Sequence, residues 1–389
     1  MRVARLALAL ALIVGVVSVA GGAPADASSK CPSGTTASRG LCVAKGATAQ
    51  RAADAVRVGF TTDALASVTV GVWQDGKPLV VGALGESMTG VPATVAMHHI
   101  AGNITNCMLS TVLLQQVEKG KLSLDDKLSK YFPDLPDADQ ITVEMLENST
   151  TGYRHYTALD SFANAFYADP FRHWTPEELI AYGVAGGPVF TPGTAFLFSD
   201  TNFLILARVL EKATGKSMDT LMRTGVLRPL GMKNTTFPDT AATPSPVLHA
   251  HTGERGFWED STFWDPSWTW YAGGMKSNLA DLHTFLVALG TGKLLTRASH
   301  RLQLARPAVH TNPDRYYALG VPVVNGWVFT NPSLDGYSGA LAYLPSKRLA
   351  VIVYTTRTQR ADADTPQATQ ILAEITNVLN PAQAIPTSS

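Results

Sequence analysis

The chain begins and ends with β-branched segments and carries helical stretches between them. Near the start, residues 67–73 and 79–84 flank Asp75-Gly76. An Asp-Gly pair between two β-branched runs predicts a β-hairpin. Four further strands are expected in the last third of the chain, at 316–324, 326–330, 339–343 and 348–355.

Helices are predicted at 48–65, at 103–118 and at 365–379. Between 141 and 232, helical stretches alternate with loops that contain proline and glycine. Strands at both ends and helices in the middle predict an α+β fold. The simplest packing is one antiparallel sheet built from both ends of the chain and flanked by helices, with an inserted all-helical lobe at about 128–254.

Composition and charge narrow the classes of function. The 389 residues are 46% hydrophobic and 16% charged, which is enough apolar material for one large domain or two closely joined ones. Lys+Arg and Asp+Glu both number 31, so no net field would attract nucleic acid or an anionic membrane. We therefore expect neither a DNA-binding nor an RNA-binding protein.

The first 27 residues have the pattern of a secretory signal peptide. Arg2 and Arg5 precede an apolar run at 6–19, and Ala25-Asp26-Ala27 fits a small-residue cleavage site. The run is shorter than the roughly 20 residues that span a bilayer, and no later segment matches that length. We therefore expect cleavage near Ala27, export from the cytoplasm, and no transmembrane segment in the mature chain.

The mature chain is expected to have three parts. They are an N-terminal segment at 28–48, a main domain at 49–380 that contains the helical lobe, and a short tail at 381–389. No internal repeat suggests a further module.

Three cysteines are present, and export makes a disulfide between two of them plausible. Cys31 and Cys42 enclose a short loop, whereas Cys107 is left unpaired. A lipid anchor on Cys31 is disfavoured, because Ser28-Ser29-Lys30 lacks the small apolar residues of a bacterial lipobox.

The start of the central helix carries the most specific motif. It runs Gly102-Asn103-Ile104-Thr105-Asn106, continues through VEKGKLSLDD at 117–126 and reaches Tyr131-Phe132-Pro133. This string resembles the penicillin-recognising serine hydrolases: class C β-lactamases, D-alanyl-D-alanine peptidases and related esterases. The resemblance covers roughly residues 50–380 and implies a β-lactamase/transpeptidase-like fold.

Two asparagines replace the catalytic pair of those families. Their helix opens with G-S-x-x-K, in which the serine is acylated and the lysine, one turn on, shares its face. In this chain Asn103 and Asn106 occupy both positions. A primary amide has no hydroxyl to deprotonate and no nitrogen that titrates near neutral pH. The resemblance therefore predicts the fold together with the loss of serine acyl chemistry.

Two further catalytic motifs are also changed. In the family's Y-x-N motif, Phe198 replaces the tyrosine and Asp200 the asparagine, so the phenol that takes part in proton transfer is missing. We identify the K-T-G or H-x-G motif with Tyr337-Ser338-Gly339, where a phenol replaces a cationic or imidazole side chain. By contrast, residues 146–152 resemble the family's L-L-x-H-T-S-G, a motif that bears on structure.

The resemblance implies an oxyanion hole of backbone N–H groups, which survives changes of side chain. These groups map to Asn103 and to Ala340, which follows Gly339, and a carbonyl or carboxylate could still bind there at the helix N-terminus. Four tryptophans within thirteen residues either contact a ligand ring or pack an irregular segment: Trp258, Trp264, Trp268 and Trp270. We assign Trp268, Trp270 and Gly339 to the ligand site.

Five other side chains are candidates for a replacement nucleophile: Thr105, Cys107, Ser110, Ser199 and Ser338. Thr105 would face away from Asn103 on a helix, while Cys107 and Ser110 lie deeper along it. A buried, inert thiol is the simplest interpretation of Cys107. Neither serine outside the helix has an evident base.

Metal and cofactor sites are not expected. His249 and His251 would share one face of an extended strand, a spacing compatible with a metal ion. However, no acidic or cysteine partner stands at a ligand-like spacing beside them, so a solvated loop is the simpler interpretation.

These observations favour a secreted, catalytically degenerate family member that binds a small acyl or peptidoglycan-like ligand without a covalent bond. One alternative is an active esterase or D-Ala peptidase with an unconventional nucleophile. Another is a structural cell-envelope protein in which the cleft is vestigial.

Overall fold

The computed structural model describes residues 31–237 and 240–387. The expected signal peptide and its cleavage site near Ala27 therefore lie outside the described residues. The compact folded unit begins at Pro32. No helix in the described ranges is long and apolar enough to cross a membrane.

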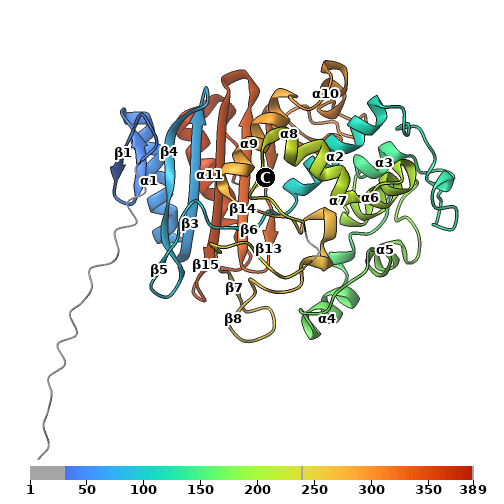
Figure 1. Ribbon diagram of the computed structural model, residues 1–389, viewed down its shortest axis with the longest axis horizontal. Helices are drawn as coiled ribbons and strands as arrows, with labels where there is room; N and C mark the ends of the chain where they lie inside the picture. The colour runs from blue at the N-terminus through green and yellow to red at the C-terminus, as the bar shows by residue number, and fades with distance from the viewer. Residues whose placement is uncertain (1–30, 238–239, 388–389) are drawn as a thin grey trace, which may run out of the picture. The chain divides into compact units, whose positions relative to one another are not determined.

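A large antiparallel sheet combines both ends of the chain, as expected for the α+β fold (Figure 1). In the described residues it has 11 strands, and β3 near the N-terminus pairs with β15 near the C-terminus. Its main path, in spatial order, is β1 (Thr35–Ser38), β2 (Leu41–Ala44), β4 (Lys77–Met88), β3 (Leu65–Gln74), β15 (Leu349–Arg357), β14 (Tyr337–Leu344), β12 (Trp327–Thr330), β11 (Pro322–Val324) and β10 (Arg315–Tyr317). Two short strands join it, β13 (Ser333–Leu334) beside β14 and β5 (Val91–Pro92) beside β4.

The Asp-Gly hairpin predicted from the sequence is confirmed, and one predicted strand is wrong. Asp75 and Gly76 between β3 and β4 both have positive φ, 51° and 74°, as a tight hairpin turn requires. The single strand expected at 316–324 is two strands. A turn separates β10 from β11, in which the Ala318 N–H donates to the Val321 carbonyl (2.9 Å).

Helices cover both faces of the sheet. Successive residues of β14 and β15 alternate between two hydrophobic cores, because side chains along a strand point to opposite faces. α1 (Ala47–Thr62) and α11 (Gln367–Leu379) pack on one face and on each other. α9 (Leu279–Thr291) packs on the other face.

The helical stretches expected between 141 and 232 are present. They are α3 (Val143–Glu147), α4 (Asp160–Ala168), α5 (Pro176–Val184), α6 (Asp200–Thr214), α7 (Met218–Met222) and α8 (Arg228–Leu230). Two small two-stranded ladders lie outside the large sheet. They pair β6 (His99–Ile100) with β9 (Lys276–Ser277), and β7 (His251–Thr252) with β8 (Glu259–Asp260). A short helix, α10 (Arg297–Gln303), precedes the last strands.

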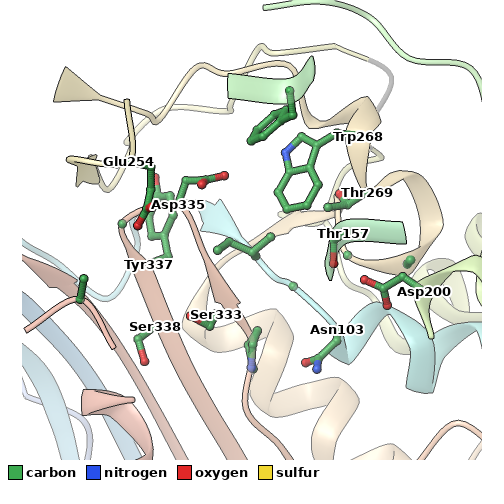
Figure 2. A pocket seen from close by; sticks show the side chains of 18 of the residues that line it. Asn103, Thr157, Asp200, Glu254, Trp268, Thr269, Ser333, Asp335, Tyr337 and Ser338 are labelled. Carbon is green, nitrogen blue, oxygen red and sulfur yellow. The ribbon is translucent and has the colours of Figure 1, made fainter. Parts of the chain in front are cut away.

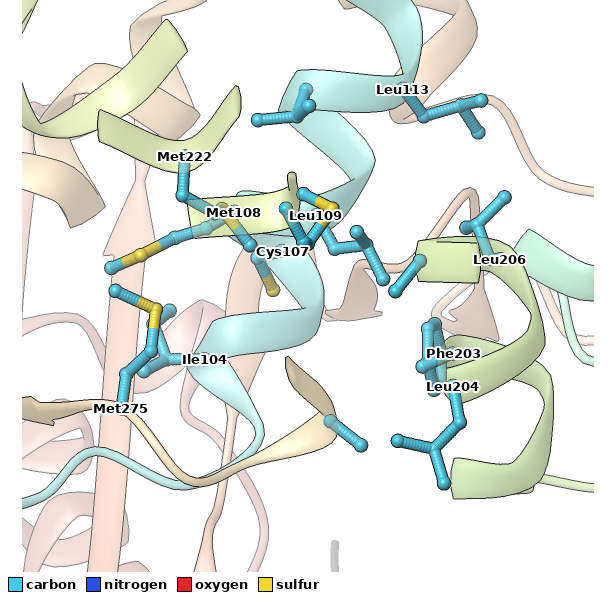
Figure 3. Packing of buried hydrophobic residues seen from close by; sticks show 14 of the residues in the cluster. Ile104, Cys107, Met108, Leu109, Leu113, Phe203, Leu204, Leu206, Met222 and Met275 are labelled. Atoms are coloured by element: carbon cyan, nitrogen blue, oxygen red, sulfur yellow. The ribbon is translucent and has the colours of Figure 1, made fainter. Parts of the chain in front are cut away.

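α2 (Ile104–Glu118) is buried on all sides. Every residue from Ile104 to Gln116 is buried, and the helix packs against α6 and α7, which bring Phe203 and Met222 into the same core (Figure 3). A helix that is enclosed all round belongs to the centre of a large core. Asn103, the N-cap residue just before this helix, lines the cavity described below.

The disulfide expected from the cysteine spacing is confirmed. Cys31 and Cys42 are disulfide-bonded, and Cys107 is the free, buried cysteine. Cys42 lies in β2, opposite Val81 of β4. Closing so short a loop removes unfolded-chain entropy worth about 3 kcal/mol.

A buried acid within α3 was not expected from the sequence. Glu147 stands at the second leucine of the family's L-L-x-H-T-S-G motif, is fully buried, and has no hydrogen-bond partner for either carboxylate oxygen. Burial raises the pKa of Glu147 to about 8, and the nearby Ser110 hydroxyl offsets this only in part. Ser110 gives its proton instead to the Leu319 carbonyl (2.7 Å). Glu147 is therefore largely protonated at neutral pH.

This burial predicts that the protein loses stability as the pH rises from the ordinary carboxyl pKa of 4.5 to about 8. In that window the unfolded chain releases the Glu147 proton while the folded chain retains it, at a cost of up to about 1.4 kcal/mol per pH unit. Glu147→Gln should remove most of this slope in urea unfolding at several pH values. The exposed control Glu374→Gln should keep it; a Glu147→Gln slope equal to that of the wild type would contradict this account.

Candidate functional site

A cavity of about 360 Å³ opens beside the N-terminus of α2 (Figure 2). Its walls come from Gly102 and Asn103, from residues 155–167, from the Trp268–Gly273 segment, from residues 332–338 and from the start of α11. Figure 2 shows Asn103, Thr157 and Asp200 on one side of it, and Asp335 with Glu254 on the other. The cavity therefore has a polar region at the α2 N-terminus and an acidic region away from it.

Asn103 lies at the N-cap of α2, at the position of the serine in the G-S-x-x-K motif that the sequence resembles. Its side-chain oxygen accepts a hydrogen bond from the Thr330 hydroxyl (2.6 Å). The amide nitrogen of this side chain and the backbone N–H of Asn103 have no hydrogen-bond partner among the described residues. Asn103 thus offers donors to the cavity and no nucleophile.

Asn106, at the position of the lysine in that motif, is 1% exposed. Neither its amide nitrogen nor its amide oxygen has a hydrogen-bond partner in the described chain. The amide lies close enough to Asp200 to act on that carboxyl, although no hydrogen bond of good geometry joins them. The Asn106 amide itself is not a titratable base.

Phe198 and Asp200 flank Ser199, which lies at the N-cap of α6. The Phe198 ring packs edge-on against His155, with ring centres 5.4 Å apart, and both residues line the cavity. Burial raises the pKa of the Asp200 carboxyl, while His155 and the Asn106 amide oppose the rise. The structure therefore brings the altered first and second motifs together, as the resemblance implied.

Tyr337 lines the cavity, but its hydroxyl makes no hydrogen bond to Asn103. Its hydroxyl is buried and donates to the Leu248 carbonyl (2.6 Å), and burial raises the pKa of this phenol. The contact with Asn103 comes instead from Thr330, at the end of β12. The strand that contacts Asn103 is thus β12, whereas the sequence analysis had placed the motif on β14.

The register of β14 also corrects the second oxyanion donor. The Gly339 N–H donates to the Pro332 carbonyl (2.7 Å), on the β13 side. Because successive N–H groups of a strand point to opposite sides, the Ala340 N–H faces Val353 of β15 inside the ladder. Ala340 is fully buried, and neither Ala340 nor Gly339 lines the cavity.

Ser333, just before β14, is a cavity-lining residue whose backbone N–H lies outside the β13–β14 ladder. The same alternation turns its N–H away from β14. Pro332, just before it, packs against Gly102: a Cβ added to Gly102 would lie 2.1 Å from the Pro332 Cβ. Gly102 also has a φ of 69°, so only glycine fits this close approach.

A histidine–threonine pair beside the cavity was missed in the sequence. The Asp200 N–H donates to His155 Nδ1 (3.1 Å), so the neutral ring carries its proton on Nε2, which faces the Thr157 hydroxyl oxygen at 2.7 Å. In this tautomer His155 cannot take a proton from Thr157. The pair orients a hydroxyl toward the cavity and is not a nucleophile with its base. Its position directly after the 146–152 motif was the only available signal.

The other candidate nucleophiles already take part in hydrogen bonds within the protein. Four of them give their proton to a backbone carbonyl: Thr105 to Gly102 (2.7 Å), Cys107 to Gly320 (3.2 Å), Ser110 to Leu319 (2.7 Å) and Ser199 to Arg154 (2.9 Å). Burial also raises the pKa of the Cys107 thiol. Ser338 lines the cavity, but its oxygen accepts the Ala368 N–H (3.4 Å) and no base accompanies it.

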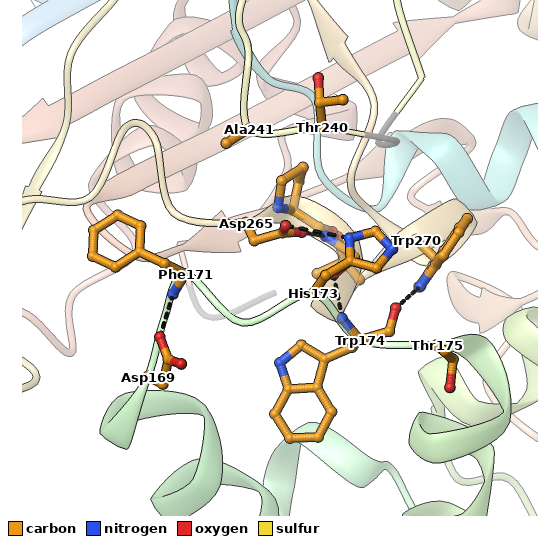
Figure 4. A network of polar contacts seen from close by, with 12 residues as sticks. Asp169, Phe171, His173, Trp174, Thr175, Thr240, Ala241, Asp265 and Trp270 are labelled. Atoms are coloured by element: carbon orange, nitrogen blue, oxygen red, sulfur yellow. Dashed lines mark hydrogen bonds and ion pairs between the residues drawn. The ribbon is translucent and has the colours of Figure 1, made fainter.

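The two tryptophans assigned to the ligand site have different roles. Trp268 lines the cavity, next to Phe162 and Phe166, with ring centres 6.4 and 4.8 Å away. Trp270 does not line it: its indole N–H donates to the Trp174 carbonyl (2.8 Å) and fixes a neighbouring loop (Figure 4). The aromatic cluster is therefore partly a cavity wall and partly packing.

The two remaining tryptophans and the histidine pair have no place in the cavity. Trp258 stacks on His251, with ring centres 5.9 Å apart, and Trp264 is 3% exposed. His249 pairs with Asp260 at 2.7 Å. The described residues contain no group of three or more side chains that could hold a metal ion.

At the far end of the cavity, three charged residues lie together. Arg357 Nη2 contacts Glu254 at 3.4 Å, and Asp335 accepts a hydrogen bond from the Tyr167 hydroxyl (3.2 Å). Burial raises the pKa of Asp335 to about 6, with Glu254 adding to the rise and Arg357 opposing it. This end carries more negative than positive charge above about pH 6.

The strand assignment leads to a prediction with a matched pair of variants. Thr330→Val and Tyr337→Phe each delete one hydroxyl and one hydrogen bond, so each should cost about 1 kcal/mol of stability. Only Thr330→Val should shift the side-chain amide resonances of Asn103 in an NMR spectrum. If Tyr337→Phe shifts the Asn103 resonances and Thr330→Val does not, the third motif belongs on β14 and this account is contradicted.

Comparisons with known proteins agree with this fold. The Beta-lactamase family model matches residues 51–374. AmpH of Escherichia coli K12, a D-alanyl-D-alanine-carboxypeptidase/endopeptidase, is 25% identical over 341 residues, 79% of this chain and 83% of the relative. The putative penicillin-binding protein PbpX of Bacillus subtilis is 24% identical over 255 residues, 65% of this chain, which spans 61% of that relative's length.

Solved structures share the same architecture. A D-stereospecific amidohydrolase from a Streptomyces species superimposes with a TM-score of 0.73 at 26% identity, covering 86% of this chain and 98% of its own. A D-amino acid amidase from Ochrobactrum anthropi, solved with L-phenylalanine amide, has a TM-score of 0.73 at 19% identity, covering 87% and 98%, and shows the fold alone. Since the family model spans most of its length, this chain belongs to the Beta-lactamase family.

Proposed function

We propose that this member of the family is a secreted, catalytically silent protein that binds a small acyl or cell-wall-type ligand reversibly in its cleft. The observation that carries the proposal is the contact between Asn103 and Thr330 (2.6 Å) at the former reaction centre. An amide oxygen that accepts a hydrogen bond stands where the related motif has an activated serine hydroxyl. No step that needs a nucleophile can begin there.

Binding does not need that nucleophile. The backbone N–H groups of Asn103 and Ser333 are available to a carbonyl or carboxylate oxygen at the start of α2, where the helix dipole favours negative charge. Trp268 and Phe166 supply an apolar wall for an adjoining side chain. The cleft is therefore suited to an acyl or amide group that remains intact.

The relatives support this class of ligand. Their names refer to D-alanyl-D-alanine ends and to amino-acid amides, which share a carbonyl beside a small or aromatic side chain. Secretion is supported by the disulfide, since disulfides persist outside the reducing cytoplasm, and by the signal-like residues 1–27.

The proposal predicts that the wild-type protein forms no adduct with a fluorophosphonate or a penicillin. Intact mass should stay unchanged after prolonged incubation, because Asn103 has no hydroxyl and His155 faces the Thr157 hydroxyl with its protonated nitrogen. A stoichiometric mass increase that maps to any residue would replace the proposal with an active hydrolase.

The same proposal predicts that chemistry can be partly restored. Asn103→Ser with Asn106→Lys should raise the affinity for phenylboronic acid at least about tenfold, because boron can then bond to the serine oxygen and the new lysine lies beside Asp200. Phe198 should still limit turnover. Asn103→Ala with Asn106→Lys is the matched control and should show no gain.

The outcome also separates the proposal from a vestigial cleft. If the serine variant is folded and gains no affinity, the reaction centre is closed to ligands, and a structural role in the cell envelope becomes the better account.

A further inference from the structure

The carboxylate of Asp200 is incompletely satisfied by its surroundings. Among the described residues it makes no ion pair, and its Oδ1 is buried with no hydrogen-bond partner. Asp200 nevertheless lines the cavity, on the same side as Asn103 (Figure 2). A buried carboxylate without a partner is costly, so this group is poised to bind a positive charge.

Asn106 adds a second unsatisfied polar group next to Asp200. Its side chain is 1% exposed, and both of its polar atoms lack partners within the described chain. It adjoins Asp200 and acts on its carboxyl. An ammonium group could donate to the Asn106 oxygen and to Asp200 together, since it carries several N–H donors.

The remaining charges around the cavity do not satisfy Asp200. The cavity-lining residues include three carboxylates and a single arginine: Asp200, Glu254, Asp335 and Arg357. The arginine already contacts Glu254, at 3.4 Å. His155, the cationic candidate nearest to Asp200, receives the Asp200 N–H on Nδ1 and faces Thr157 with Nε2, so it turns no N–H toward the carboxylate.

We propose that Asp200, supported by Asn106, binds a primary ammonium group of the ligand. The replacement of the motif's asparagine by aspartate would then convert a neutral amide contact into recognition of a cation. This inference rests on the proposed reversible binding in the cleft and adds to it the charge of the ligand.

Three phenyl compounds of similar size test the charge preference: phenethylamine, 3-phenylpropanamide and 3-phenylpropanoate. By calorimetry, the wild-type protein should bind the amine about tenfold more tightly than the neutral amide, and the anion most weakly, as a charge-assisted hydrogen bond implies. Asp200→Asn should reduce the ratio between amine and amide to about one. Asp134→Asn, which removes the same charge from an exposed site outside the cavity wall, should leave the ratio unchanged.

Each outcome decides between the two proposals. Equal affinity of the wild type for amine and amide overturns the ammonium site but leaves reversible binding in place. No binding of any of the three overturns both. Asp200→Ser, a second variant, should match Asp200→Asn, and a tenfold preference retained by either folded variant overturns the assignment to Asp200.

A competition experiment distinguishes a site for an organic ammonium group from a site for a simple metal cation. Potassium chloride should not displace phenethylamine more than choline chloride does at the same ionic strength. Displacement by potassium alone would show an alkali-cation site and overturn the ammonium proposal.

Discussion

The placement of the α2 N-terminus is the constraint on which the rest of this structure depends. The Ala101 and Gly102 N–H groups donate to Met275 (2.6 Å) and Gly273 (3.0 Å), and the Tyr354 hydroxyl donates to the Ala101 carbonyl (2.7 Å). Pro332 closes the opposite side against Gly102. Because α2 itself is enclosed by the core, these contacts hold its first residue at the cavity whatever side chain that residue carries.

This arrangement is consistent with the proposal that catalysis is lost while the cleft is kept. The contacts that position α2 are made by backbone atoms, by glycine and by residues remote from the reacting atoms. Asn103 and Asn106 replace two reactive side chains with amides, which change the chemistry without emptying the core. Asp200 places a carboxyl group where the related motif has a neutral amide, and the proposed preference for an ammonium group follows from this difference.

Local patterns predicted much of the fold. The Asp75-Gly76 hairpin, α1, α2 and α11 follow from turn chemistry and hydrophobic spacing, and the disulfide follows from the position of Cys31 and Cys42. The resemblance also placed Asn103, Phe198 and Asp200 at one cavity, since their motifs are short and flanked by distinctive residues.

The remaining features depend on information that a single sequence does not contain. The third motif was assigned to β14 because its Gly-x-Ser-Gly pattern fits, yet Thr330 on β12 makes the contact with Asn103. The direction of the Ala340 N–H is set by strand register, which is decided by pairing across the sheet. The His155–Thr157 pair and the buried Glu147 arise from packing between segments distant in the chain.

The central claim is that the cleft holds its ligand without reacting with it. The most direct measurement is a crystal structure of the wild-type protein soaked with D-phenylalanine amide. The account predicts an intact amide whose carbonyl oxygen lies between the backbone N–H groups of Asn103 and Ser333. Electron density continuous between the ligand and any side chain, or a cleaved product, would contradict it.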